Sequence, residues 1–136
     1  MKLDSLYPVL LTDHVAGCTA FFVEHLGFRE GFTSDWYLSL VHAGNEAYEL
    51  AIISHDHGSI PESFRLPTSA LLLNLEVPNV SEEYDRLRAE GVAVLQPLED
   101  LPAGQRHFIC RAPGGVMVDV IEVIPPSEEY TKGYIS

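Results

Sequence analysis

The spacing of apolar residues predicts the same run of elements twice along the chain. In each half, an apolar strand is followed by helical spacing that ends at a glycine, and then by three short strands separated by turn-forming residues. The first half has a strand at 3–11, a helix that begins at an Asp13 cap and ends at Gly27, and strands at 28–33, 36–42 and 47–54. The second half has a strand at 70–77, a helix that begins at an Asn79 cap and ends at Gly91, and strands at 92–96, 106–111 and 116–123. The chain is therefore predicted to consist of two βαβββ modules.

Repeated βαβββ modules with short turns predict an α+β fold. We expect the modules to form a paired-sheet, partly open barrel around a cavity, with the helices outside. The prolines and the glycine at 57–68 mark a linker loop. The predicted organisation is a first module at 1–56, the linker at 57–68, a second module at 69–124 and a C-terminal tail at 125–136.

Composition and charge exclude several classes of partner. The 136 residues carry 20 acidic and 8 basic side chains, a formal charge of −12, which gives no electrostatic footprint for nucleic acid or an anionic membrane. The N-terminal residues contain neither a signal-like apolar run nor a membrane span, so we expect a cytoplasmic protein. Cys18 and Cys110 match no zinc or redox spacing and are expected to be free thiols.

Two acidic residues interrupt otherwise apolar strands. Glu49 and Asp119 occupy equivalent places in the two modules, and each follows a glycine-containing turn. Burying a carboxylate without a partner is costly, so each must face solvent or a cavity. Their equivalence predicts that the two carboxylates converge on one cavity.

Four motifs carry a resemblance to a known family. They are YPVLLTDHVAGCTAFFVEHLGF at 7–28, YELAII at 48–53, NLEVPNVSEEYDRLRAEGV at 74–92 and APGGVMVDVIEV at 112–123. Together they resemble the vicinal oxygen chelate superfamily, which contains glyoxalase I, bleomycin-resistance proteins and extradiol dioxygenases. The resemblance implies paired βαβββ modules. In the metalloenzymes of the family, it also implies a divalent ion held by one residue from each of four strands.

The chain departs from the metal-binding pattern that this resemblance implies. Glu49 and Asp119 match the two acidic positions, but Leu6 and Leu72 fall on the two positions usually held by histidine. Leucine cannot ligate a metal, and two carboxylates alone make a weak site. We therefore expect no metal and no cofactor; if a divalent ion does bind, Glu49 and Asp119 are its ligands.

His107 is the candidate for recognition or proton transfer beside Asp119. The resemblance implies that the positions of His107 and Ile109 line the pocket, whereas a plain hairpin count places Phe108 and Cys110 on the face of Asp119. A bulge would be needed to reconcile the two, so the facing of His107 stays open at this stage. A His–carboxylate pair could hold a ligand or act as an acid or base.

Aromatic and apolar residues complete the expected binding site. The rings of Trp36 and Tyr37 begin a strand near the cavity and either contact a ligand or pack in the core or a dimer interface. With Leu6 and Leu72 added, the cavity suits a hydrophobic or aromatic molecule. The ligand-binding residues predicted from the sequence are Leu6, Trp36, Tyr37, Glu49, Leu72, His107, Ile109 and Asp119.

Three functions remain open at this stage. The favoured one is a metal-free protein of the bleomycin-resistance type that binds a small hydrophobic or aromatic molecule and sequesters it. The alternative is a metal-dependent enzyme of the glyoxalase or dioxygenase type (a lyase, an isomerase or a ring-cleaving enzyme) with a displaced metal site. The third is a structural module whose cavity is filled by side chains. The resemblance also implies a homodimer.

Overall fold

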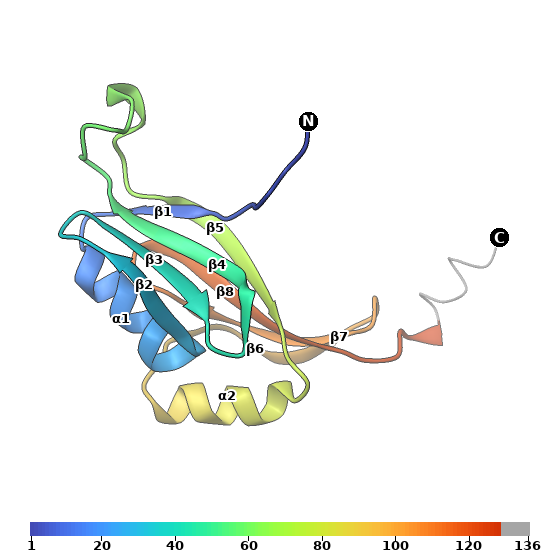
Figure 1. Cartoon of the computed structure of the whole chain (residues 1–136). Helices are drawn as coiled ribbons and strands as arrows, with labels where there is room; N and C mark the ends of the chain where they lie inside the picture. The colour runs from blue at the N-terminus through green and yellow to red at the C-terminus, as the bar shows by residue number, and fades with distance from the viewer. Residues whose placement is uncertain (129–136) are drawn as a thin grey trace. The chain divides into compact units, whose positions relative to one another are not determined.

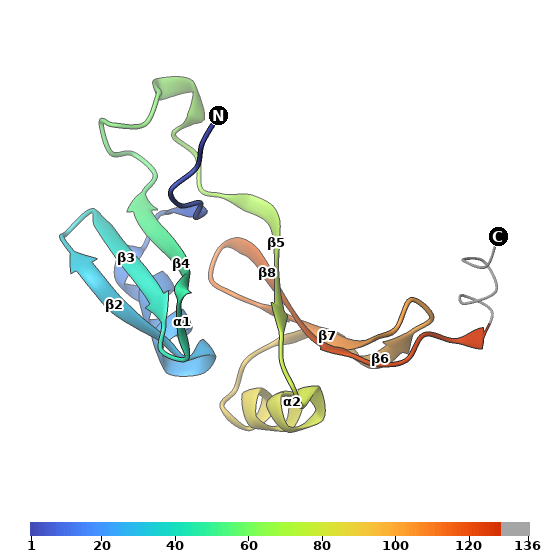
Figure 2. The ribbon, with the colours of Figure 1, turned by 45° about the vertical axis from the view of Figure 1, so that its right-hand side comes forward.

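The computed structural model describes residues 1–128, which form two compact units (Figures 1 and 2). One unit comprises Met1–Ser69 with Pro113–Gly115, and the other comprises Ala70–Ala112 with the chain from Val116 onward. Part of the predicted tail, residues 129–136, lies outside the described residues. The module boundaries inferred from the sequence stay predictions.

The first unit holds a four-stranded sheet covered by one helix. Its strand order is β1-β4-β3-β2; β1 runs parallel to β4, and the other neighbours are antiparallel. A short 3₁₀ helix, η1 (Glu62–Phe64), interrupts the connecting loop. The elements are β1 (Val9–Thr12), α1 (Val15–Leu26), β2 (Phe28–Thr33), β3 (Tyr37–His42) and β4 (Asn45–Ser54).

The second unit repeats this plan with strand order β5-β8-β7-β6. Its elements are β5 (Ser69–Glu76), α2 (Val80–Ala89), β6 (Val94–Leu101), β7 (Gln105–Arg111) and β8 (Gly115–Val123). The prediction of an α+β fold made of two βαβββ modules is confirmed. No helix in residues 1–128 is long and apolar enough to cross a membrane.

In each unit, alternate strand residues pack against the helix. Phe22 of α1 lies edge-on to Phe28 at 5.7 Å between ring centroids, and Tyr84 of α2 lies 4.9 Å from Phe108 of β7. Because side chains alternate along a strand, these contacts identify the face of each sheet that is covered by its helix. The buried residues on the two helix-covered faces include Leu10, Leu38, Leu40, Leu50 and Ile52 in the first unit, and Phe108, Cys110, Val118 and Val120 in the second. The opposite faces carry Glu49 and Asp119.

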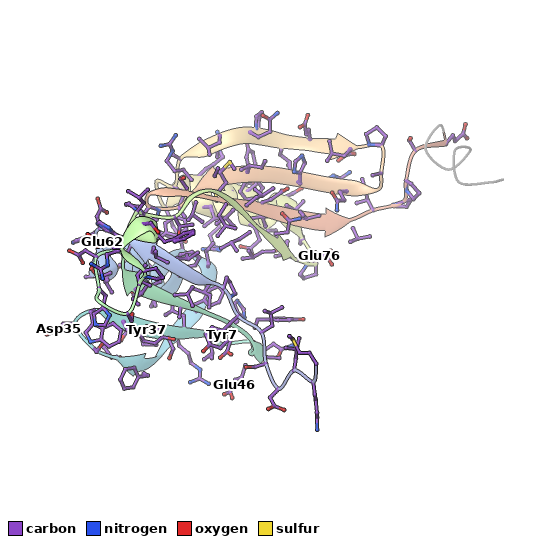
Figure 3. The ribbon with its side chains drawn as sticks, turned by 90° about the horizontal axis from the view of Figure 1, so that it is seen from above. Tyr7, Asp35, Tyr37, Glu46, Glu62 and Glu76 are labelled. Carbon is purple, nitrogen blue, oxygen red and sulfur yellow. The ribbon has the colours of Figure 1, made fainter. Side chains whose placement is uncertain are left out.

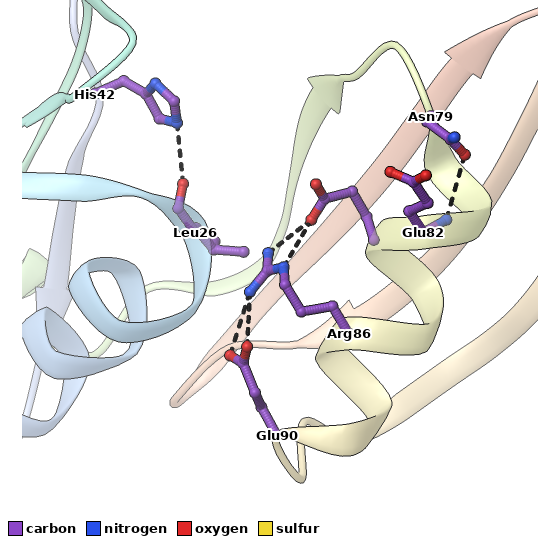
Figure 4. A network of polar contacts seen from close by, with 7 residues as sticks. Leu26, His42, Asn79, Glu82, Arg86 and Glu90 are labelled. Atoms are coloured by element: carbon purple, nitrogen blue, oxygen red, sulfur yellow. Dashed lines mark hydrogen bonds and ion pairs between the residues drawn. The ribbon is translucent and has the colours of Figure 1, made fainter.

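The helix caps agree with the sequence prediction at α2 and differ at α1. Asn79 caps α2 by accepting a hydrogen bond from the Glu82 N–H, as expected (Figure 4). The N-cap of α1 is His14, whose Nδ1 accepts from the Gly17 N–H, so the predicted Asp13 cap is wrong. Histidine is not among the residues that sequence rules recognise as caps, although its ring nitrogen can do the same work as an asparagine oxygen.

Two strands have bounds that differ from those predicted. β1 begins only at Val9, because Pro8 has no N–H to donate and contributes only its carbonyl, which accepts from the Ala51 N–H. Leu6 therefore lies outside the strand and is 84% exposed. β6 continues past residue 96 to Leu101, with its register shifting across Pro97, as an edge strand with a bulge allows.

Candidate functional site

The register of β7 and β8 determines which residues share a face with Asp119. Ile109 pairs directly with Asp119, and His107 pairs with Ile121, without a bulge between these strands. His107 and Ile109 therefore lie on the face of Asp119, and the hairpin count that placed Phe108 and Cys110 there is wrong. The hairpin closes with a hydrogen bond from the Ala112 N–H to the Val116 carbonyl, leaving residues 113–115 as the loop. A two-residue turn would shift the pairing by one residue, so that Phe108 and Cys110 and not His107 and Ile109 would share the face of Asp119.

His107 and Asp119 form a buried hydrogen-bonded pair. The His107 Nδ1 lies 2.7 Å from the Asp119 Oδ1, and the two residues are 6% and 7% exposed. An ionised carboxylate only accepts hydrogen bonds, so Nδ1 carries the proton and the other ring nitrogen, Nε2, is the site that can exchange one. Asp119 thus fixes both the orientation and the tautomer of the imidazole.

The outer nitrogen of His107 is an unsatisfied buried atom. Within residues 1–128, only this Nε2 and the Thr19 Oγ1 are buried side-chain polar atoms without a hydrogen-bond partner. The Glu99 Oε1 lies 3.5 Å away, too far for a formed hydrogen bond but within the range of an ion pair if the ring is protonated. Glu99 in turn accepts from the Gln96 Nε2 at 3.2 Å. Asp119 of β8, His107 of β7 and Glu99 of β6 therefore form a row of polar side chains across the sheet, which ends at the edge strand β6.

Glu99 and Gln96 were not predicted as site residues. Glu99 pairs directly with His107 in the β6–β7 ladder, on a stretch that the sequence analysis placed beyond the end of the strand. Recognising that the edge strand continues past Pro97 would have placed Glu99 beside His107.

A second set of polar side chains lies around Glu49 in the first unit. Glu49 pairs with Val41 of β3, so its side chain lies on the face opposite α1, together with Tyr37. Tyr37 forms a side-chain hydrogen bond with Tyr7, which was not predicted as a site residue although it lies within the strand predicted at 3–11 (Figure 3). Burial raises the pKa of Tyr37, with further contributions from Tyr7 and from the negative charge of Glu49. Tyr37 is therefore a neutral phenol across the physiological range.

Trp36 lies just outside β3 and packs against the connecting loop. Its ring stacks on His57 with the centroids 3.7 Å apart and the planes 7° from parallel. The His57 Nδ1 accepts from the Ser59 N–H, and His55 hydrogen-bonds through Nδ1 to the Arg65 carbonyl. One face of the indole is thus used for packing, while Trp36 remains 40% exposed.

The donors at the family's metal positions do not fit a metal ion. Leu6 and Leu72, which are 84% and 43% exposed, supply no ligand atom. No three His, Cys, Asp or Glu side chains gather in a metal-binding arrangement within residues 1–128. Glu49 and Asp119 belong to different units, so their convergence stays a prediction.

Both cysteines belong to the helix-covered cores. Cys18 and Cys110 are free and buried, and burial raises the pKa of each thiol to about 11. A thiol with such a pKa is a poor nucleophile at neutral pH. Neither cysteine is a candidate for chemistry.

Residues 5–120 match the family model of the Glyoxalase/Bleomycin resistance protein/Dioxygenase superfamily. The chain belongs to this superfamily. No functionally curated protein matches the chain at a significant level.

Solved structures share the fold at low sequence identity. A superfamily member from Sphaerobacter thermophilus DSM 20745 superposes with a TM-score of 0.72 at 22% identity, covering 88% of this chain and 98% of its own. TnmS3, an antibiotic binding protein from Streptomyces sp. CB03234, gives 0.70 at 21% identity, with coverages of 90% and 97%. Lactoylglutathione lyase from Agrobacterium tumefaciens gives 0.70 at 16% identity, with coverages of 89% and 95%. The fold is thus shared by a binding protein and an enzyme, and the function must be argued from the site.

Proposed function

We propose that this protein binds a small hydrophobic or aromatic molecule without a metal ion and sequesters it unchanged, as a homodimer. The observation that carries the proposal is the buried His107 Nε2, which has no hydrogen-bond partner in residues 1–128. The hydrogen bond between His107 Nδ1 and Asp119 fixes the orientation of this ring. A buried polar atom without a partner costs free energy that a ligand's hydroxyl or N–H group could recover. The half-buried Ile109, on the same face, would supply hydrophobic contact.

The donor set at the family's metal positions supports binding without a metal. Leucines replace two of the four expected ligands, leaving only carboxylates. The superfamily as a whole includes proteins that bind small molecules, and the structural neighbour TnmS3 carries the description of an antibiotic binding protein. These likenesses support a binding function for this chain.

The His107–Asp119 pair also favours a second candidate function, proton transfer to or from a bound substrate. An imidazole oriented by a carboxylate through Nδ1 leaves Nε2 able to take a proton from a substrate atom within hydrogen-bond reach. A metal-dependent version of this activity would need ligands at positions that leucine occupies. Proton transfer by the pair alone needs none.

A ligand screen in the presence of a chelator tests the proposal. Thermal shifts would be measured with aromatic natural-product compounds in excess EDTA, for the original protein and for His107→Phe, and each bound compound would be recovered for mass analysis. We expect hits that raise the melting temperature without metal, that weaken in His107→Phe and that are recovered unchanged. Converted compounds would favour the enzyme, and hits that vanish in EDTA would overturn metal-free binding.

The matched control variant is Tyr84→Phe. Tyr84 packs its ring against Phe108 on the helix-covered side of the same sheet, and phenylalanine preserves that ring contact. Hits should bind Tyr84→Phe as they bind the original protein. An equal loss of binding in both variants would mean that His107→Phe acts through the fold and not through Nε2.

A further inference from the structure

The face of the first unit's sheet opposite α1 carries a carboxylate flanked by two phenols. Tyr37 of β3 pairs with Ile53 of β4, which lies four residues along the strand from Glu49 on the same face. Tyr7 is two residues before Val9, and the Pro8 carbonyl accepts from the Ala51 N–H, so the chain at Tyr7 runs alongside β4. The side-chain hydrogen bond between Tyr7 and Tyr37 places both rings on this same face (Figure 3).

Among residues 1–128, Glu49 has no cationic partner of its own. Within residues 1–128, no ion pair reaches Glu49, although the side chain is half-buried. Val41 of β3 pairs with Glu49 on one side and with Arg29 of β2 on the other, so Arg29 is the nearest cation across the sheet. Arg29 instead forms its ion pair with the exposed Glu46. The negative charge of Glu49 is therefore left uncompensated within a partly apolar, aromatic setting.

We propose that Glu49 and the Tyr7–Tyr37 pair form a site within the first unit for a positively charged nitrogen, such as that of an aromatic or hydrophobic amine. This site goes beyond the proposed function, because it is built from first-unit residues alone. Glu49 supplies the counter-charge, and each phenol offers an oxygen acceptor and an electron-rich ring face. The chain's net charge of −12 attracts cations toward the protein over longer distances.

The chemistry of the three side chains distinguishes this preference from general hydrophobic binding. A neutral aromatic molecule gains ring contact with the tyrosines but leaves the Glu49 charge uncompensated. An ammonium group gains the ion pair, a hydrogen bond to a phenol oxygen and a cation–π contact. The preference for the charged molecule should therefore depend on Glu49 and weaken as salt rises.

The test uses the full chain in EDTA with two probes of similar size, benzylammonium and benzyl alcohol, titrated by NMR. We expect benzylammonium to bind roughly fivefold or more tightly than benzyl alcohol, with the largest shifts at the amides of Glu49 and Tyr37. Glu49→Gln should abolish the preference, and Tyr37→Phe should reduce it. The control Glu62→Gln removes the same charge from the exposed η1 helix and should retain the preference.

Equal affinities for the two probes, or an undiminished preference in Glu49→Gln, would overturn the inference. A melting curve verifies that each variant is folded, and Tyr37→Phe provides a second, independent disruption of the same group. The proposed function is judged separately, by hits that require His107. Neutral hits that require His107 and ignore Glu49→Gln would leave that function standing while refuting the amine preference.

Discussion

Removing His107 alone should cost more stability than removing His107 and Asp119 together. The two atoms are 2.7 Å apart, and the side chains are only 8% and 10% exposed. His107→Phe leaves the Asp119 carboxylate buried without its partner, at a cost of about 3–5 kcal/mol. Asp119→Val leaves the imidazole without its carboxylate and with both ring nitrogens unsatisfied, at a cost of about 1–3 kcal/mol.

The double variant His107→Phe/Asp119→Val replaces the pair with apolar groups and leaves no buried polar atom behind. We expect the free energy of unfolding of this double variant to be within about 2 kcal/mol of that of the original protein. The two single losses sum to about 4–8 kcal/mol, so the coupling energy is at least about 2 kcal/mol. Urea unfolding of the four proteins measures each free energy of unfolding. The same cycle on the exposed Arg106–Asp100 pair is the control and should show no coupling beyond error. Additive losses for His107 and Asp119 would refute the reasoning, because they would mean that neither side chain satisfies the other.

Three further predictions concern the helices and the thiols. In urea titrations, His14→Asn should raise the free energy of unfolding by a few tenths of a kcal/mol, because asparagine is a better N-cap than histidine. Asn79→Ala should lower it by about 1 kcal/mol, because alanine cannot cap α2. A lower free energy of unfolding in His14→Asn would mean that the His14 ring has a role beyond capping. Glu122→Leu should cost about 1 kcal/mol, since the Glu122 Oε1 accepts from the Val80 N–H at the start of α2; unchanged stability would show that water replaces this contact. The thiols of Cys18 and Cys110 have a pKa of about 11 in the folded state, whereas unfolded thiols have a pKa of about 9. The free energy of unfolding should therefore fall as pH rises from 9 to 11, and it should fall less in the Cys18→Ala/Cys110→Ala double variant. An equal pH dependence in both proteins would contradict this prediction.

The repeated fold was predictable from the sequence because its signals are local. Apolar periodicity and the glycines that end the helices identified every strand and both helices. The Asn79 cap was predictable because the asparagine side-chain oxygen readily accepts a hydrogen bond from a backbone N–H at the start of a helix. The position of Glu49 and Asp119 on the sheet faces opposite the helices followed from the cost of burying an unpaired charge among apolar strand residues.

The composition of the site was less predictable because it depends on register and on strand ends. The facing of His107 turned on the length of the loop at residues 113–115, where one residue more or less exchanges the two faces of β7. Glu99 was missed because its strand was predicted to end at residue 96, whereas β6 continues to Leu101. Tyr7 lies within the strand predicted at 3–11 but was not predicted as a site residue. Their contacts are made across strands, where spacing in the sequence gives no signal.

Arg86 shows how the helix surface differs from these candidate sites. It forms ion pairs with Glu83 and Glu90 along α2 at the spacing expected for neighbours on a helix (Figure 4). These charges compensate one another on the exposed surface. Glu49 has no ion pair in residues 1–128 and the His107 Nε2 has no hydrogen bond there, and that difference marks them as candidates for ligand contact.

The measurement that tests metal-free binding most directly is the metal content of the protein after exposure to zinc, nickel, manganese and iron(II), followed by desalting. Mass spectrometry gives the ions retained per chain, and thermal melting in parallel shows whether any of them stabilises the fold. Leucine at two of the family's ligand positions predicts substoichiometric retention and an unchanged melting temperature. One ion per chain with a raised melting temperature would contradict the account and would indicate a metal site built from other residues.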